Sequence, residues 1–440
     1  MTGLSRSSTY NYAIQILLAQ FLIAFGCGPS RGAGITAVSA NDFLSSLGVV
    51  THIDQGVSGT ACVEPLRYLG VRNIRDGASH LGQILLVHRQ TGVRVNLVSG
   101  GDIRSLISSG KTMAAADALM AFEGPNEPNN FPINYEGQRG GNTGSWKPVA
   151  EYQRVLYKTV KSDPDLRGYP VFSVSEAGAE TDNVGLQFLT IPAAAGATFP
   201  DGTQYADFAN VHNYVVSNRK AYVDNQAWNA ADPTLNGPWD GLFVEYGVTW
   251  LKHYKGYTND QLLSLPRVTT ETGWDSASDV GGEETQAKVL VNTYLSQFKQ
   301  GWRYTFVYHL RDGEGGSEHQ GLFNPNSTPK LAATYIHNLT SILADDRPVA
   351  SRGQLNYSMS DQPATVHDLL LQKSSGVFEL AVWDENVKGA DHITLNLGGS
   401  HSRVKVYDVS VGIDPVQTLG NVSSLPLTLS DHAMVIEIAD

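Results

Sequence analysis

From about residue 45 to residue 345, short apolar runs alternate with stretches of helical hydrophobic spacing. An apolar run of strand length that stops at a turn signal is typical of a buried strand, and apolar residues spaced three and four apart are typical of a helix. The predicted strands are 48–54, 71–75, 93–98, 118–122, 171–176, 208–212, 267–271 and 304–308. The predicted helices include 80–91, 102–117, 149–161, 184–195, 242–254, 283–299 and 330–343.

This alternation decides the fold class. Eight strand–helix repeats predict a (β/α)8 TIM barrel, over residues 41–345, rather than an open doubly wound sheet. No glycine-rich dinucleotide fingerprint follows the first strand, which removes the main reason to prefer the open sheet.

The pattern changes from about residue 347 onward. Short strands separated by turn residues predict a small C-terminal β-sandwich over residues 347–440. The predicted strands are 365–371, 377–383, 392–397, 404–409, 425–429 and 434–438. This accessory domain is either a structural brace or a weak sugar-binding surface.

The composition narrows the function. The chain has 440 residues and a formal net charge of −12, which argues against nucleic acid as a partner because phosphate binding needs clustered Lys and Arg. Charged residues make up 17%, whereas Gly (44) and Tyr (19) are plentiful, a balance that suits a secreted protein with long polar loops.

Residues 1–33 resemble a secretory leader. Arg6 precedes the apolar segment 13–25, which is short for a membrane span and is followed by the small residues Gly26, Cys27 and Gly28. Either the leader is a signal peptide, or it is a lipoprotein leader that lipidates Cys27, although the Leu usual at the third position before such a cysteine is absent. The expected location is therefore secreted or in the cell envelope. If Cys27 is removed with the leader or is lipidated, Cys62 is the only thiol left, so no disulfide framework is expected.

Several carboxylates end predicted strands, and these strand ends meet on one face of a barrel. They are Asp54, Asp76, Glu127, Glu176 and Glu271. Two stand in unusual settings, Glu127 in Gly-Pro-Asn-Glu-Pro-Asn and Glu271 in Thr-Thr-Glu-Thr-Gly-Trp. In a retaining glycosidase, two carboxyl groups about 5–5.5 Å apart act as nucleophile and as acid/base. The acid must be kept protonated by its surroundings.

These two strand ends resemble those of the clan A glycoside hydrolases, a retaining (β/α)8 superfamily. The resemblance covers roughly residues 45–345 and implies that Glu127 is the acid/base and Glu271 the nucleophile. It further implies substrate-site roles for other residues. They are Asn126 at the sugar 2-hydroxyl, Arg75 in support of the nucleophile, and His212 and Tyr214 after the sixth strand. The eighth strand lacks the Trp that many members use as a sugar platform, and Trp274, Trp302 or a loop aromatic are candidate substitutes.

The sequence therefore predicts an O-glycosyl hydrolase that cleaves β-glycosidic bonds of a poly- or oligosaccharide, without a cofactor or metal ion. Glu123 is set aside as a residue that pairs with a base lower in the barrel. A metal-dependent hydrolase is disfavoured because no His-x-His appears on the first strand. The alternative is a non-catalytic carbohydrate-binding or cell-envelope protein on a glycosidase-like barrel.

Overall fold

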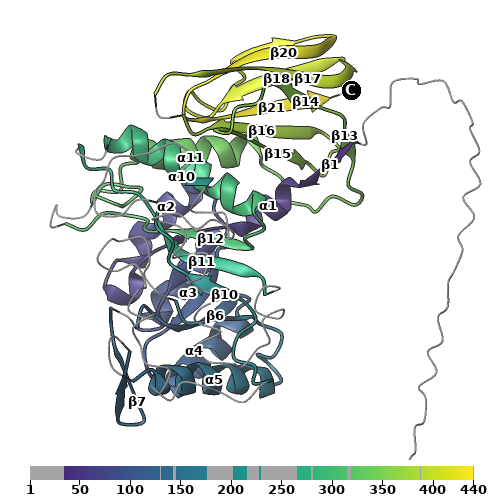
Figure 1. The fold of residues 1–440 in the computed structure, drawn as a ribbon. Coiled ribbons are helices and arrows are strands. Elements are labelled where there is room, and N and C mark those ends of the chain that lie inside the picture. Colours follow the sequence, from purple (N-terminus) through teal and green to yellow (C-terminus); the bar gives the residue numbers. More distant parts are fainter. Residues whose placement is uncertain are drawn as a thin grey trace, which may run out of the picture. The chain divides into compact units, whose positions relative to one another are not determined.

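The computed structural model describes nine stretches of the chain between residues 34 and 439 (Figure 1). They are 34–128, 130–141, 145–175, 202–215, 227–228, 265–278, 281–314, 319–386 and 388–439. The predicted leader with Cys27, the helices 184–195 and 242–254, and Glu176 lie outside the described residues. None of the helices described is long and apolar enough to cross a membrane.

Eight parallel strands form the barrel, in the order β10-β11-β12-β3-β4-β5-β6-β9. Their bounds are β3 (Leu47–Val50), β4 (Asn73–Asp76), β5 (Arg94–Ser99), β6 (Leu119–Pro125), β9 (Val171–Phe172), β10 (Ala209–Val211), β11 (Arg267–Thr272) and β12 (Tyr304–Val307). A parallel bridge between Phe172 and Phe208 joins the two ends of this order. The predicted (β/α)8 barrel is confirmed.

Apart from the first, which was not predicted, the described helices follow the predicted stretches closely. They are α1 (Ala40–Ser46), α2 (Gly59–Leu69), α3 (Leu81–Thr91), α4 (Ile103–Ala115), α5 (Lys147–Ser162), α10 (Gly282–Lys299) and α11 (Leu331–Ile342). The Asp102 carboxylate caps α4 by accepting from the backbone N–H groups of Arg104 and Ser105. Gly92 ends α3 with a positive φ of 77°, a conformation that glycine adopts without strain.

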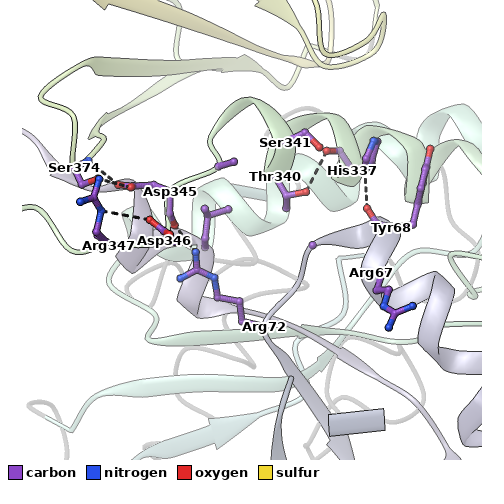
Figure 2. A pocket seen from close by; sticks show the side chains of 13 residues that line it. Arg67, Tyr68, Arg72, His337, Thr340, Ser341, Asp345, Asp346, Arg347 and Ser374 are labelled. Carbon is purple, nitrogen blue, oxygen red and sulfur yellow. Dashed lines mark hydrogen bonds and ion pairs between the residues drawn. The ribbon is translucent and has the colours of Figure 1, made fainter. Parts of the chain in front are cut away.

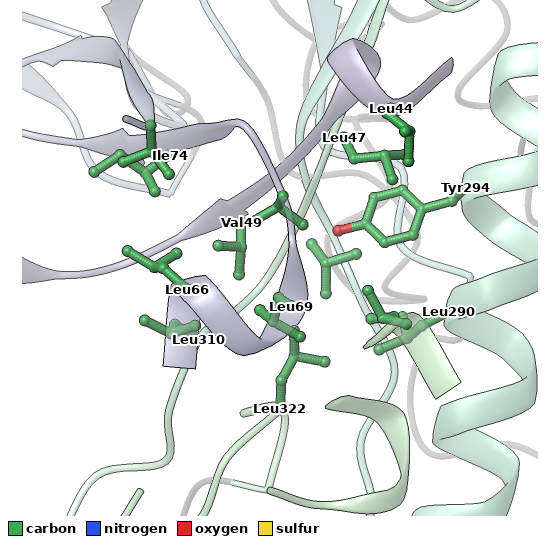
Figure 3. Packing of buried hydrophobic residues seen from close by; sticks show 14 of the residues in the cluster. Leu44, Leu47, Val49, Leu66, Leu69, Ile74, Leu290, Tyr294, Leu310 and Leu322 are labelled. Atoms are coloured by element: carbon green, nitrogen blue, oxygen red, sulfur yellow. The ribbon is translucent and has the colours of Figure 1, made fainter. Parts of the chain in front are cut away.

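Apolar side chains pack on both sides of the strand wall. Outside β3, Leu47 and Val49 pack with Leu66 of α2 and Tyr294 of α10, as Figure 3 shows. Tyr294 also donates a hydrogen bond of 2.7 Å to the Gly48 carbonyl. Inside, the Phe306 ring lies so close to Gly48 that an added Cβ would meet it at 2.4 Å, so β3 needs glycine there.

A β-sandwich follows the barrel, which confirms the predicted second domain type. One sheet has the order β14-β17-β20, and the other has the order β19-β18-β21-β16-β15-β2. The strands are β14 (Ser358–Ser360), β15 (Val366–Gln372), β16 (Phe378–Asp384), β17 (Asp391–His401), β18 (Arg403–Asp408), β19 (Gln417–Leu419), β20 (Val422–Leu429) and β21 (Ala433–Ala439).

The six-stranded sheet is buried on both faces. Leu370 and Leu380 pack between the two sheets, whereas their neighbours Leu369, Leu371 and Ala381 belong to the barrel's core cluster. In Figure 1, α10 and α11 lie beside β15 and β16. Because successive side chains of a strand point to opposite faces, this sheet contributes to the core between the two sheets and to the core of the barrel.

Several short strands, β14 and β19 among them, were not predicted. β1 (Ile35–Thr36) pairs with β13 (Gln354–Leu355), and β2 (Val38–Ser39) joins the six-stranded sheet beside β15, so residues before the barrel complete the accessory sheets. The segment after β6, where no strand was predicted, contains a hairpin of β7 (Ile133–Tyr135) and β8 (Gln138–Gly140).

Candidate active site

The end of β6 places two consecutive polar side chains, Asn126 and Glu127, at the mouth of the barrel. Gly124 and Pro125 end the strand, and the next turn is closed by the Glu127 carbonyl, which accepts from the N–H groups of Asn130 (2.8 Å) and Phe131 (2.7 Å). Glu127 has a φ of +39°, in the left-handed region that costs a residue with a Cβ roughly 1 kcal/mol or more. Such strain is retained where the surrounding structure requires one side-chain position.

Arg75, at the end of β4, lies at the centre of the cluster. Its guanidinium donates to both oxygens of Glu123 (2.8 and 2.9 Å) and to Glu271 Oε1 (2.6 Å). Arg75 also donates a hydrogen bond of 2.7 Å to Asn126 Oδ1, so this contact uses the oxygen of the Asn126 side chain and not its amide nitrogen. The prediction that Glu123 pairs with a base is confirmed, and Arg75 is that base. Asp76 instead accepts from the backbone of Ile53 and Asp54.

His212 bridges the two candidate catalytic carboxyls. Its Nδ1 lies 2.6 Å from Glu127 Oε1 and 3.6 Å from Glu271 Oε2. Tyr214 donates a hydrogen bond of 2.8 Å to the same Glu271 oxygen. Glu271 is thus held by Arg75 on one oxygen and by Tyr214 on the other, which fixes the orientation of its carboxyl group.

The surroundings also set the charge states of the neighbouring groups. Burial opposes the charge of Glu123, but the adjacent Arg75 cation lowers the pKa of Glu123 below its usual value. Burial and the charges of Glu271 and Glu127 raise the pKa of Tyr214 well above its usual range, so Tyr214 keeps its proton.

Glu127 differs from the sequence-based expectation. Burial alone would raise its pKa, but the hydrogen bond and charge of His212, with a further hydrogen bond from Asn130, lower the pKa of Glu127 below its usual value. The expectation that the surroundings of Glu127 hold its proton is therefore incomplete, because His212 stabilises the Glu127 carboxylate.

Among the described residues, one group has metal-ligand geometry: Glu127, His212 and Glu271 each offer an atom within 4.8 Å of the others. The Arg75 guanidinium is bonded directly to Glu271, and its positive charge would repel a metal cation at this position. The donor set therefore fits proton transfer better than it fits a metal ion.

A pocket of about 150 Å³ opens beside the cluster. Arg75, Asn126 and Glu271 line it together with His52 and Asp54 from the loop after β3. A larger hollow of about 510 Å³, shown in Figure 2, lies between α2, α11 and the start of the sandwich. Its arginines are engaged by neighbouring groups, such as Arg72 by Asn41, and it contains none of the candidate catalytic residues. The small pocket is therefore the better candidate site.

The structure brings together six of the seven predicted site residues: Arg75, Asn126, Glu127, His212, Tyr214 and Glu271. Trp274 differs, because its side chain is fully buried in the barrel's core cluster and offers no surface to a sugar. Trp302, also predicted as a possible platform, is buried as well, with 5% exposed.

The sequence reasoning missed two aromatic residues near the site. Tyr308 follows β12, is half-buried and lies edge-on to Tyr214 with 6.3 Å between ring centroids. His52 lies 5.0 Å from the Tyr308 ring and lines the pocket. Tyr308 ends the predicted eighth strand, the place where a platform Trp was sought, so its position was the available signal.

No protein family model matches the sequence, and no curated protein matches it. Solved structures do match in fold. A family 39 glycoside hydrolase from Bacteroides cellulosilyticus WH2 aligns with a TM-score of 0.59 at 15% identity, over 90% of this chain and 82% of that chain. A family 30 endoxylanase from Clostridium papyrosolvens C71 aligns with a TM-score of 0.51 at 12% identity, over 93% and 98%.

A third match comes from another glycoside hydrolase family. The family 51 arabinofuranosidase from Xanthomonas axonopodis pv. citri aligns with a TM-score of 0.50 at 11% identity, over 93% and 98% of the two chains. The chain has the fold of the clan A glycoside hydrolases. The resemblance inferred from the strand-four and strand-seven motifs is thus confirmed at the level of the fold, and no one family within the clan is singled out.

Proposed function

We propose that the chain is a retaining glycoside hydrolase that cleaves β-glycosidic bonds of a poly- or oligosaccharide. The observation that carries this proposal is the separation of the two strand-end carboxyls: an oxygen of Glu127 lies within 4.8 Å of an oxygen of Glu271. Retaining enzymes hold their carboxyl groups about 5–5.5 Å apart, whereas inverting enzymes leave room for a water at roughly 6.5–9.5 Å.

In the first step, a Glu271 oxygen attacks the anomeric carbon and forms a glycosyl ester. The bond to the leaving oxygen breaks, and that oxygen takes its electron pair and a proton delivered through Glu127. Arg75 and Tyr214 hold the two Glu271 oxygens and so orient the nucleophile. In this proposal Asn126, whose side-chain oxygen accepts from Arg75, contacts the sugar 2-hydroxyl.

In the second step, water attacks the anomeric carbon and Glu271 leaves as a carboxylate. The water gives its proton to Glu127, which restores the starting protonation state. The strained backbone of Glu127 is consistent with this double role, because the same oxygen must face the leaving group and then the water.

The test uses Glu127→Ala and Glu271→Gln on a broad panel of aryl β-glycosides and defined oligosaccharides. We expect Glu271→Gln to lose at least about 10³-fold in kcat, and Glu127→Ala to be impaired most on substrates with poor leaving groups. Glu64→Gln, an exposed carboxylate on α2, is the matched control and should behave as wild type.

The proposal fails if the wild-type protein cleaves nothing in the panel or if neither variant loses activity. Binding of oligosaccharides without cleavage would instead favour the non-catalytic alternative. We further propose that residues 1–33 direct the protein to the cell envelope or outside the cell. Mass spectrometry of the mature N-terminus distinguishes a cleaved signal peptide from a lipidated Cys27.

A further inference from the structure

A chain of buried hydrogen bonds leads from Glu123 to Glu127 through two side chains that do not face the pocket. Glu123 Oε1 lies 3.0 Å from Thr270 Oγ1, which in turn lies 2.9 Å from His212 Nε2. On its other side, His212 Nδ1 lies 2.6 Å from Glu127 Oε1. Glu123, His212 and Thr270 are all fully buried, so no water competes for these contacts.

The direction of each hydrogen bond in this series follows from the charge states of the residues at its two ends. Glu123 is ionised, because Arg75 and the Asn96 amide donate to it. A carboxylate only accepts, so the single proton of the Thr270 hydroxyl goes to Glu123 or to the Asn210 carbonyl oxygen, 3.1 Å away. In both cases the Thr270 oxygen is left with lone pairs toward His212.

His212 Nε2 must therefore carry a proton, which it donates to Thr270. A neutral imidazole has one N–H, so Nδ1 would then present a lone pair to Glu127 Oε1. Two lone pairs at 2.6 Å repel, and the contact is stable only if one proton lies between Nδ1 and Oε1. That proton belongs either to a Glu127 acid or to a His212 imidazolium, and the pair is neutral in both cases.

The other charged and titratable groups around His212 are compatible with this neutral pair. Glu271 Oε2 from β11 is 3.6 Å from Nδ1, and the Glu271 carboxyl group accepts hydrogen bonds from Arg75 of β4 and from the Tyr214 hydroxyl after β10. An additional negative charge on Glu127 would lie within 4.8 Å of a Glu271 oxygen, which opposes loss of the shared proton.

We propose that Glu123 and Thr270 are positioning residues that fix the tautomer of His212, so that the Glu127–His212 pair keeps one proton for the leaving group. This inference rests on the proposed function for its last step, but the tautomer itself does not depend on turnover. When the leaving oxygen takes the proton, the pair becomes anionic, and the attacking water later returns a proton to it.

The direct test is nitrogen NMR of the protein labelled with ¹⁵N-histidine. His212 is one of 12 histidines, and its signals are assigned by their loss in His212→Gln. We expect Nε2 to be protonated in the wild-type protein near pH 6. A wild-type His212 that is protonated on Nδ1 alone overturns the proposal, whether or not any substrate is cleaved.

Thr270→Val removes the acceptor without changing the side-chain shape. His212 then has no partner for an Nε2 proton and should change to the tautomer with hydrogen on Nδ1, which leaves Glu127 as an unprotonated acceptor. The alkaline midpoint of the kcat/KM profile should move down by about one pH unit or more. At neutral pH, aryl glycosides with poor leaving groups should lose about tenfold or more, whereas dinitrophenyl glycosides, which need no proton, should keep their rate.

Thr270→Ser and Thr305→Val are the matched variants. The serine retains the hydroxyl and should restore the wild-type tautomer and pH profile. Thr305→Val removes another buried barrel hydroxyl, one that donates to Gln297 Oε1 at 2.6 Å, and should leave both readouts unchanged. An unchanged His212 tautomer in folded Thr270→Val, or a uniform loss across all leaving groups, contradicts the assignment.

Discussion

The mouth of the barrel and the seam between barrel and sandwich both bury carboxyl groups, but they neutralise them in different ways. At the mouth, defined here by Arg75, Glu123 and Glu271, two carboxylates share one guanidinium. In the seam, defined by Trp228, Ser296 and Glu385, the Glu385 carboxyl accepts from the Trp228 backbone N–H (3.1 Å) and lies 3.4 Å from the Ser296 hydroxyl.

A nearby histidine, His367, does not supply a positive charge to Glu385. His367 Nε2 is 3.9 Å from Glu385, but burial and the charge of Lys299 lower the pKa of His367 to about 4, so it is neutral at ordinary pH. Burial therefore raises the pKa of Glu385 to about 8. At the mouth, Arg75 keeps the Glu123 carboxylate charged, whereas in the seam burial keeps the Glu385 carboxyl protonated.

The largest effect is expected from removing the shared cation. Arg75→Met leaves Glu123 and Glu271 buried without their partner, and breaking a buried ion pair in this way costs about 3–5 kcal/mol. We expect a correspondingly lower free energy of unfolding in urea. Adding Glu123→Gln to Arg75→Met should recover part of the loss, because one uncompensated charge is then removed. Equal stability of Arg75→Met and wild type would show that these carboxylates are neutral.

For the seam, the raised pKa of Glu385 predicts that the stability of the protein falls as the pH rises. Because the pKa of Glu385 is raised to about 8, the folded state holds a proton that the unfolded chain releases at lower pH. The stability from this group is present below the unfolded pKa and is lost as the pH rises through about 8. Glu385→Gln is neutral at every pH, so it should be more stable than wild type near pH 9, by about 1–3 kcal/mol, and nearly equal to it at pH 5.

The measurement for the seam is thermal or urea unfolding at both pH values. Glu64→Gln is again the control, since its side chain is 78% exposed, and it should show no such crossover. A wild-type protein that loses no stability relative to Glu385→Gln between pH 5 and pH 9 would mean that Glu385 is ionised in the fold.

The mouth of the barrel was largely predictable from the sequence, whereas the seam was not. The barrel strands were predictable because each is an apolar run that ends at a turn, and the strand order then placed Glu127 near Glu271. The pairing of Glu123 was predictable in kind, since a charge inside a strand needs a partner. Its partner was not, because only the closed barrel brings Arg75 to Glu123 and Glu271 together.

The seam was not predictable from local pattern. Glu385 follows β16 at a position that reads as an ordinary polar strand end, and its burial depends on the packing of the sheet against α10. The two-residue strands β1 and β2 are too short to show a period, and their pairing is set by the sheets that they join. Trp274 looked like a sugar platform from its place beside Glu271, but its burial depends on the helices outside the barrel.

The smallest effect is expected from removing a partly exposed ion pair between the barrel and the sandwich. Lys299 of α10 lies 3.1 Å from Asp368 of β15, and both side chains retain some exposure, at 34% and 16%. A partly exposed pair contributes up to about 1 kcal/mol and is screened by salt, so Lys299→Met should destabilise the protein only slightly, and less so in 1 M NaCl. Because the Lys299 charge also lowers the pKa of His367, the variant should let His367 accept a proton at a higher pH than in the wild type. A loss as large as that of Arg75→Met would show that the seam, like the mouth, depends on a cation.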